Sequence, residues 1–262
     1  MGSDSLDAQE LSDFLNEKVL LYQTSAFIDS DPVSIPHQFS LREDIEVAGF
    51  LTATISWGNR SAILKSAKTL MQMLDYAPHQ FVMMASNREI ESLQKFYYRT
   101  FQGVDVVAFI KALRPIYLDG GMERLFIPPG LDCSLQHGIA NFRQHMIGGM
   151  PLRTLKHLSD VAKGSSGKRL NMFLRWMVRP ATGGVDFGLW NQISPRDLYL
   201  PLDVHTARVG RALGLLARRQ NDWKAVEEIT CALRGLDAED PVKYDFALFG
   251  LGVFEKFGAD GK

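Results

Sequence analysis

Two residues of this 262-residue chain could do chemistry, and each is expected at the start of a helix. Lys168 follows a glycine-containing stretch, residues 164–167, and opens a predicted helix that Pro180 ends. Asp203 precedes an apolar pattern over 204–216 and is expected to cap that helix. A lysine amine without its extra proton is a nucleophile, and a carboxylate can accept a proton or stabilise a positive charge. These two helix starts are therefore candidates for a reactive site.

Each residue also has a purely structural interpretation. A lysine in the first turn of a helix is commonly solvated, although the helix dipole mildly disfavours its charge there. An aspartate at an N-cap contributes about 1 kcal/mol to stability with no catalytic role. His205 is expected to form a structural hydrogen bond across the hairpin and not to act as a base or metal ligand. Among the six histidines only His137 and His145 show a ligand-like spacing, and it is weak, so a metal centre is not expected. We therefore expect no metal ion and no cofactor.

Apolar residues recur at a spacing of three to four along almost the whole chain, which predicts an all-α, two-lobed fold. The predicted lobes are residues 41–133 and 134–262, preceded by an N-terminal helix and an extended loop over 1–40. The stretch 119–133, with three glycines and two prolines, is the expected connection. Helices are predicted over 8–21, 41–57, 61–74, 78–85, 105–118, 135–146, 168–179, 204–216, 223–233 and 240–254.

Overall composition is that of a globular protein. Hydrophobic residues make up 46% of the chain and charged residues 23%, which argues against a disordered or fibrous protein. No apolar run approaches the roughly 20 residues of a membrane-spanning helix, and the first residues do not resemble a signal peptide. Two cysteines are too few for a four-cysteine iron–sulfur site. We expect a soluble, cytoplasmic protein without an iron–sulfur cluster.

Charge is distributed unevenly along the sequence. The net charge of −1 argues against a uniformly basic nucleic-acid binder. Residues 151–220 nevertheless contain twelve lysines and arginines against four acidic residues, a local charge of +8. Chance clustering on solvated helix faces is one interpretation of this stretch. The other is a surface that binds a polyanion.

The second half of the chain resembles the helix-hairpin-helix DNA glycosylase superfamily, in the segments GSSGKRLNMFLRWMV (164–178) and LPLDVHTARVGRALGL (200–215). In that family a glycine-rich hairpin ends in a lysine at a helix start, and an aspartate begins the next helix. Lys168 and Asp203 match those positions, and their separation of 35 residues is nearest to the archaeal 8-oxoguanine DNA glycosylases. Ser166 stands where the usual hairpin has a glycine, so phosphate binding by the hairpin is the least matched feature. The chain also resembles an uncharacterised bacterial family with the segments LNMFLRWMVR, PLDVHTARV and DPVKYDFALFGLGV.

The glycosylase resemblance implies a DNA repair enzyme that rotates a damaged base out of the duplex and cleaves its N-glycosidic bond. Lys168 would attack the sugar and form a Schiff base, which permits strand cleavage as in an AP lyase. Asp203 would deprotonate the amine or stabilise the positive charge on the sugar. The partner would be damaged double-stranded DNA, with an oxidised purine as one candidate lesion. The expected DNA contacts are Gly164, Gly167, Arg175, Arg208, Arg211, Asn59 and Arg60, and the residues expected to line the base pocket or fill the vacated stack are Trp57, Phe96, Tyr97 and Trp176.

Two other functions remain open at the level of the sequence. A non-catalytic helical module of the same fold would bind nucleic acid or a protein partner without cutting anything. For nucleic acid, that module would show salt-dependent binding, weakened by charge reversal at Arg175, Arg208 or Arg211 and insensitive to neutralising Asp203. An enzyme acting on a free nucleoside is the third hypothesis.

Overall fold

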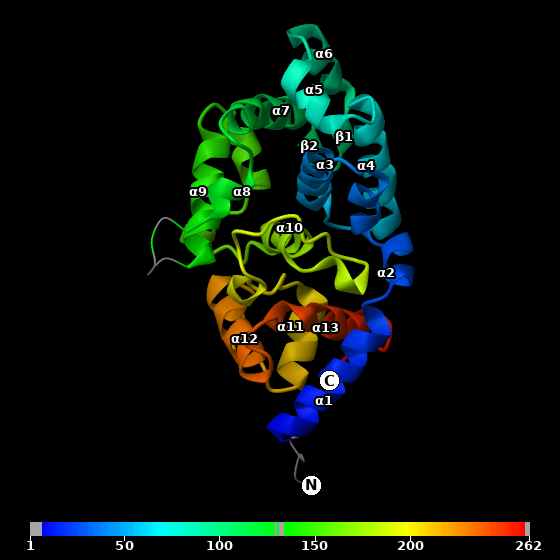
Figure 1. The fold of residues 1–262 in the computed structure, drawn as a ribbon, viewed down its shortest axis with the longest axis vertical. Helices are drawn as coiled ribbons and strands as arrows, with labels where there is room; N and C mark the ends of the chain where they lie inside the picture. The colour runs from blue at the N-terminus through cyan, green and yellow to red at the C-terminus, as the bar shows by residue number, and fades with distance from the viewer. Residues whose placement is uncertain (1–6, 129, 131–133, 260–262) are drawn as a thin grey trace. The chain divides into compact units, whose positions relative to one another are not determined.

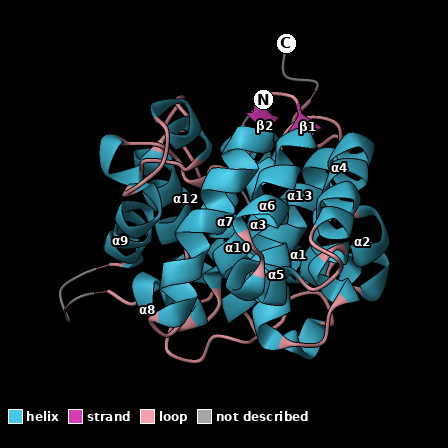
Figure 2. Ribbon diagram, turned by 90° about the horizontal axis from the view of Figure 1, so that it is seen from above, coloured by secondary structure: helices cyan, strands magenta, loops and turns pink. Residues whose placement is uncertain are grey.

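The structure, a computed structural model, describes residues 7–128, 130 and 134–259 and divides the chain into two compact units. The terminal unit comprises the residues up to Phe27 and those from Lys163 onward, and the inserted unit comprises Ile28–Ala162. Helices dominate both units, so the expected all-α class is confirmed (Figure 2). Of the helices described, none combines the length and hydropathy that a membrane-crossing segment needs.

The inserted unit is built around α3 (Arg42–Ile55), which is buried along most of its length. Phe50 of α3 stacks on Phe109 at 5.7 Å between ring centroids and meets Phe142 edge-on at 5.3 Å, so three helices share one aromatic core. A short hairpin, β1 (Tyr97–Tyr98) with β2 (Phe101–Gln102), is the sheet found in the described part of the chain. The other helices of this unit are α4 (Arg60–Met73), α5 (Pro78–Met84), α6 (Asn87–Ser92), α7 (Gly103–Leu118), α8 (Glu123–Phe126) and α9 (Leu135–Ile147), and α2 (Ser25–Ser30) contains the boundary between the units.

The terminal unit is organised by its last helix, α13 (Tyr244–Val253), which packs against both α1 and α11. In Figure 1 the blue N-terminal helix lies beside the red C-terminal one. Two glycines of α13 permit this packing. A Cβ on Gly250 would come within 2.1 Å of the Tyr22 ring, and a Cβ on Gly252 would lie 3.0 Å from His205 Cβ. The other helices of this unit are α1 (Ala8–Tyr22), α10 (Lys168–Val178), α11 (Val204–Ala212) and α12 (Trp223–Leu236).

The division of the chain differs from the predicted lobes. The predicted boundary falls at residue 133, which lies outside the described residues. Helix α9 packs against α7 and α8 and therefore belongs to the inserted unit, while α1 joins the second half of the chain by packing on α13. Apolar periodicity predicts that a helix has a buried face, but it does not say which distant helix covers that face.

Candidate functional site

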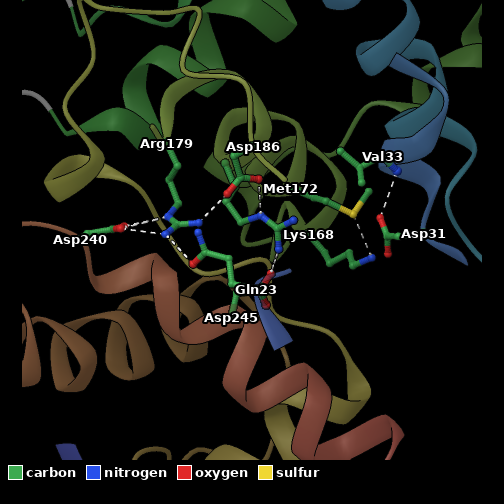
Figure 3. Close-up of polar contacts among 10 residues, drawn as sticks. Gln23, Asp31, Val33, Lys168, Met172, Arg179, Asp186, Asp240 and Asp245 are labelled. Atoms are coloured by element: carbon green, nitrogen blue, oxygen red, sulfur yellow. Dashed lines mark hydrogen bonds and ion pairs between the residues drawn. The ribbon is translucent and has the colours of Figure 1, made fainter. Parts of the chain in front are cut away.

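Lys168 is the first residue of α10, in the terminal unit. Gly167 precedes it with φ of 62°, a left-handed conformation that glycine adopts without a side-chain clash, and this turn starts the helix. The Lys168 side chain is half-buried, and Nζ donates to Met172 Sδ at 3.5 Å, one turn along α10 (Figure 3). A thioether is a weak acceptor, so this contact gives the ammonium little stabilisation.

Asp203 caps α11, as the sequence predicts. Its Oδ1 accepts from the backbone nitrogens of His205 (2.8 Å) and Thr206 (3.0 Å), and Thr206 Oγ1 accepts from the Asp203 nitrogen (2.8 Å). This is a reciprocal capping box. Among the described residues, every hydrogen bond to this carboxylate uses Oδ1, which leaves Oδ2 for another partner.

Asp245 is a buried carboxyl of α13 that the sequence did not predict as a site residue. Burial in α13 raises the pKa of Asp245 to about 6, and Arg175 opposes that rise. The charge of Asp203 raises the pKa further, whereas that of Lys168 lowers it. Lys168 and Asp203 therefore both act electrostatically on one buried carboxyl. The signal in the sequence is a single aspartate inside the otherwise apolar segment YDFALFGLGV.

Arg175 belongs to a buried ion-pair network, which corrects its predicted role as a phosphate contact. It is only 4% exposed, and its guanidinium pairs with Asp245 through Nη1 and with Asp186 through Nε (3.2 Å). Asp186 also pairs with Arg179, which in turn binds Asp240 at 2.8 Å (Figure 3). Since both carboxylate partners lie in the core, Arg175 holds α10 to α13 and is not presented to a nucleic acid.

Arg208 and Arg211, the other predicted phosphate contacts of this unit, bind main-chain carbonyls. Arg208 donates to the Gly252 oxygen at 2.6 Å and to the Phe257 oxygen at 3.2 Å. Arg211 donates from Nε to the oxygen of Arg218 at 2.9 Å and from Nη2 to the loop that follows. Both side chains therefore stabilise the segments that follow α11 and α13, which leaves fewer of their N–H groups for phosphate.

The two predicted hairpin glycines differ in their surroundings. Gly164 has φ of 89°, is exposed, and accepts a hydrogen bond on its oxygen from the Trp223 nitrogen at 3.0 Å. A Cβ there would meet nothing within 4 Å. Gly167 is buried at the start of α10, where no side chain caps the helix. The uncapped amides of this first turn are the clearest anion-binding feature that the predicted hairpin retains.

Two of the four predicted base-pocket residues are buried in the cores of their units, which corrects their assignment. Trp176 in the terminal unit is 0% exposed and Phe96 in the inserted unit is 3% exposed, so neither ring can stack on a base in this conformation. Trp57 is half-buried and stacks on His157 at 5.9 Å, while Tyr97 is 70% exposed on β1. Both belong to the inserted unit.

The predicted contacts Asn59 and Arg60 also lie in the inserted unit, at the start of α4. Asn59 caps this helix by accepting from the Ala62 nitrogen at 3.1 Å. Arg60 donates to Ser30 Oγ at 3.5 Å and is half-buried. Within the residues that the structure describes, no three histidine, cysteine or acidic side chains gather as metal ligands would.

Comparison with protein-family models shows a match to a family described as "Protein of unknown function (DUF2400)" over residues 31–254. The chain belongs to the DUF2400 family. The match covers the inserted unit from residue 31 onward and includes Lys168, Asp203 and Asp245. Neither the curated proteins nor the solved structures provided a match.

Proposed function

We propose that this DUF2400 protein is a DNA repair enzyme of the helix-hairpin-helix glycosylase type, which cleaves the N-glycosidic bond of a damaged base and has associated AP lyase activity. The observation that carries the proposal is that Lys168 and Asp203, each at the start of a helix in the terminal unit, both act electrostatically on the buried carboxyl of Asp245. The two residues are 35 positions apart in the sequence. The family resemblance of the two segments supplies the reaction class.

In the proposed reaction, the neutral amine of Lys168 attacks C1′ of the extruded nucleotide. The bond between Nζ and C1′ forms, and the bond from C1′ to the base breaks with its electron pair leaving on the base. Opening of the sugar ring converts the adduct into a Schiff base. Loss of a proton from C2′ then expels the 3′ phosphate and cuts the strand.

Asp203 is assigned the electrostatic part of this reaction. Its Oδ1 is held by the first amides of α11, which fixes the carboxylate in one orientation. Oδ2 is available to face the positive charge that grows on the sugar as the base leaves. A carboxylate held in advance stabilises that charge without reorganising during the reaction.

Arg175 is buried, and Arg208 and Arg211 are bound to carbonyls. In this proposal the phosphate is therefore bound by other groups at the start of α10. The uncapped first turn of α10 presents amides beside Lys168. Arg169 follows directly, and burial lowers the pKa of its guanidinium to about 10, so it stays positively charged at neutral pH. A phosphate beside the attacked sugar would meet both groups.

Borohydride trapping on duplexes with defined lesions tests the proposal. The wild-type protein should form a covalent adduct with at least one oxidised-purine or abasic duplex. Lys168→Ala should lower the yield at least 100-fold, because the Schiff base cannot form. Lys224→Ala, which removes an exposed lysine from α12 of the same unit, should trap normally.

The absence of any adduct and of strand cleavage across a full lesion panel would exclude the proposed reaction. Salt-dependent binding without an adduct would instead favour the non-catalytic module. If free nucleosides compete for the protein more strongly than oligonucleotides do, the result would favour an enzyme that acts on a free nucleoside.

A further inference from the structure

The tip of the β-hairpin in the inserted unit carries an arginine where the backbone favours a glycine. Strands β1 and β2 are joined by the two residues Arg99 and Thr100, and Arg99 has φ of 52°, in the left-handed region. Glycine and asparagine adopt this conformation most readily, and two-residue hairpin turns usually place them there. Backbone preference therefore does not account for an arginine at this position, and its side chain is the feature to explain.

The Arg99 guanidinium lies over Gly58, in the turn between α3 and α4. A Cβ on Gly58 would overlap Arg99 Nη1, so the guanidinium occupies the space that a side chain would need. Tyr98 fixes the hairpin to the same turn, because its hydroxyl donates to the Trp57 oxygen at 2.5 Å. Arg99 is exposed, and its side chain forms no hydrogen bond or ion pair with the residues that the structure describes. Its N–H groups are therefore available to an anion.

A second arginine, Arg153, binds the same hairpin. Its Nη2 donates to the Thr100 oxygen at 3.4 Å, and its Nη1 donates to Gln102 Oε1 at 2.9 Å. Arg153 also pairs with Asp105 at 3.1 Å. The Asp105 side chain is completely buried, whereas that of Arg153 is 41% exposed, so the guanidinium and not the carboxylate reaches the surface here.

The three segments that reach this turn contain basic residues and no acidic ones. They are residues 47–74, 92–104 and 146–159. All of their lysines and arginines except the half-buried Arg60 are exposed. The basic residues are Arg60, Lys65, Lys68, Lys95, Arg99, Arg153 and Lys156. Positive side chains spread over three segments suit an extended polyanion better than a single small anion.

We propose that the surface around the hairpin turn, with Arg99 and Arg153, binds the phosphate backbone of a nucleic acid. The inference rests on the proposed function only for the choice of DNA as the partner, and it adds a contact in the inserted unit. The planar guanidinium of Arg99 matches the geometry of a phosphate group. Tyr97, which is 70% exposed on β1, offers a ring face on which a base can stack.

Fluorescence anisotropy with a labelled, undamaged DNA duplex tests this surface in the full-length protein. The dissociation constant is measured over a range of salt concentrations. Arg99→Gly should weaken binding several-fold and reduce the salt slope of log Kd by about one, because one phosphate contact is lost. Arg99→Lys keeps the positive charge and should retain most of that slope. The control is Arg88→Ala, which removes an exposed arginine from α6 of the same unit and should bind as the wild type does.

Thermal unfolding of the same variants separates binding from folding. Glycine fits the left-handed turn better than arginine does, so the unfolding midpoint of Arg99→Gly should equal or exceed that of the wild type. A lower midpoint together with weaker binding would show that Arg99 stabilises the hairpin and would overturn the inference.

The inference would also be overturned if the wild-type protein showed no salt-dependent binding, or if Arg99→Gly and Arg88→Ala behaved alike. Tighter binding to phosphatidylglycerol vesicles than to DNA would overturn it in favour of a membrane surface. The undamaged duplex offers no lesion, so this readout is independent of adduct formation. Binding that depends on Arg99 in a protein that traps no lesion would support the surface while removing the glycosylase proposal. Normal trapping with binding unaffected by Arg99→Gly would do the reverse.

Discussion

Three aspartates of the terminal unit show how the surroundings of a carboxyl determine its role. Asp203 is half-buried and binds backbone amides at a helix start. Asp222 caps α12, and its hydrogen bond from Arg218 lowers the pKa of that carboxyl to about 2. Asp245 lies in the core, where burial raises its pKa to about 6. A carboxyl with a pKa of about 6 changes its charge near neutral pH, as groups in functional sites often do.

The titration of Asp245 predicts a pH-dependent contribution to the stability of the protein. Its folded pKa lies above the ordinary value of 3.8, so its stabilising contribution is complete below pH 3.8 and is lost as the pH rises through 6. Relative to Asp245→Asn, the wild-type protein should lose about 2–3 kcal/mol of unfolding free energy between pH 4 and pH 7.

Urea denaturation of both proteins at pH 4, 5, 6 and 7 measures this difference. The carboxylates with lowered pKa values, such as Asp222, titrate in both proteins and cancel in the comparison. A constant difference across this range would show that Asp245 keeps its ordinary pKa in the fold.

Single residues could be predicted from the sequence only where local rules define them. Asp203 was predictable as an N-cap and Lys168 as a first-turn residue, because both roles depend on neighbours within four positions. Asp245 was not, because its partner Arg175 lies 70 positions away. Arg175 was misassigned to a DNA contact for the same reason, because a charge count over residues 151–220 includes Asp186 but omits Asp245, the α13 carboxylate with which Arg175 also pairs.

At the scale of elements, α10 and α11 begin in opposite ways. Gly167 starts α10 through its left-handed backbone and leaves the first amides without a side-chain cap. Asp203 starts α11 with a capping box that occupies them. The proposed site therefore combines an open helix start beside Lys168, suited to an anion, with a closed one that holds a carboxylate.

The double role of Asp203 can be separated by two substitutions. Asp203→Asn should keep the stability of the protein within a few tenths of a kcal/mol, because asparagine is an equally good N-cap. It should nevertheless reduce adduct formation by at least 100-fold, because the negative charge is gone. Asp203→Ala should show the same loss of adduct and should also cost about 1 kcal/mol of stability.

Thermal unfolding and borohydride trapping on the same samples distinguish these outcomes. Normal trapping by Asp203→Asn would show that Asp203 serves only as a helix cap and has no role in the reaction.

Helix positions were more predictable than helix ends. The periodic apolar pattern located α3, α4, α7 and α9 to within about three residues, because a buried face repeats every 3.6 residues. The last helix was expected from residue 240, but a 3₁₀ turn over Pro241–Lys243 precedes α13. A residue before proline usually has an extended backbone, yet Ile35, which precedes Pro36, has helical dihedral angles (φ −73°, ψ −56°) between two 3₁₀ turns. Such short turns depend on packing that no local pattern encodes.

At the scale of the whole molecule, the inserted unit is continuous in sequence and the terminal unit is not. The terminal unit needs α1 against α13, two helices from opposite ends of the chain, while the inserted unit has its own aromatic core. We expect residues 28–162 to fold alone and residues 163–262 to require residues 1–27.

Limited proteolysis and circular dichroism on separate fragments test this expectation. The fragment 28–162 should be helical and should unfold cooperatively. The fragment 163–262 should gain helix and protease resistance when a peptide of residues 1–27 is added. An unfolded 28–162 fragment, or a 163–262 fragment that is stable without the peptide, would contradict the division described above.

The pairing of α1 with α13 also has a consequence for biosynthesis. More than two hundred residues separate Tyr22 from Tyr244. At roughly 5–20 residues per second, α1 leaves the ribosome about 10–45 s before its partner helix is made. During that interval its apolar stripe, with Leu15 and Val19, has no permanent cover from α13. Chaperone capture of nascent chains should therefore concentrate on this first helix and end when the last one emerges.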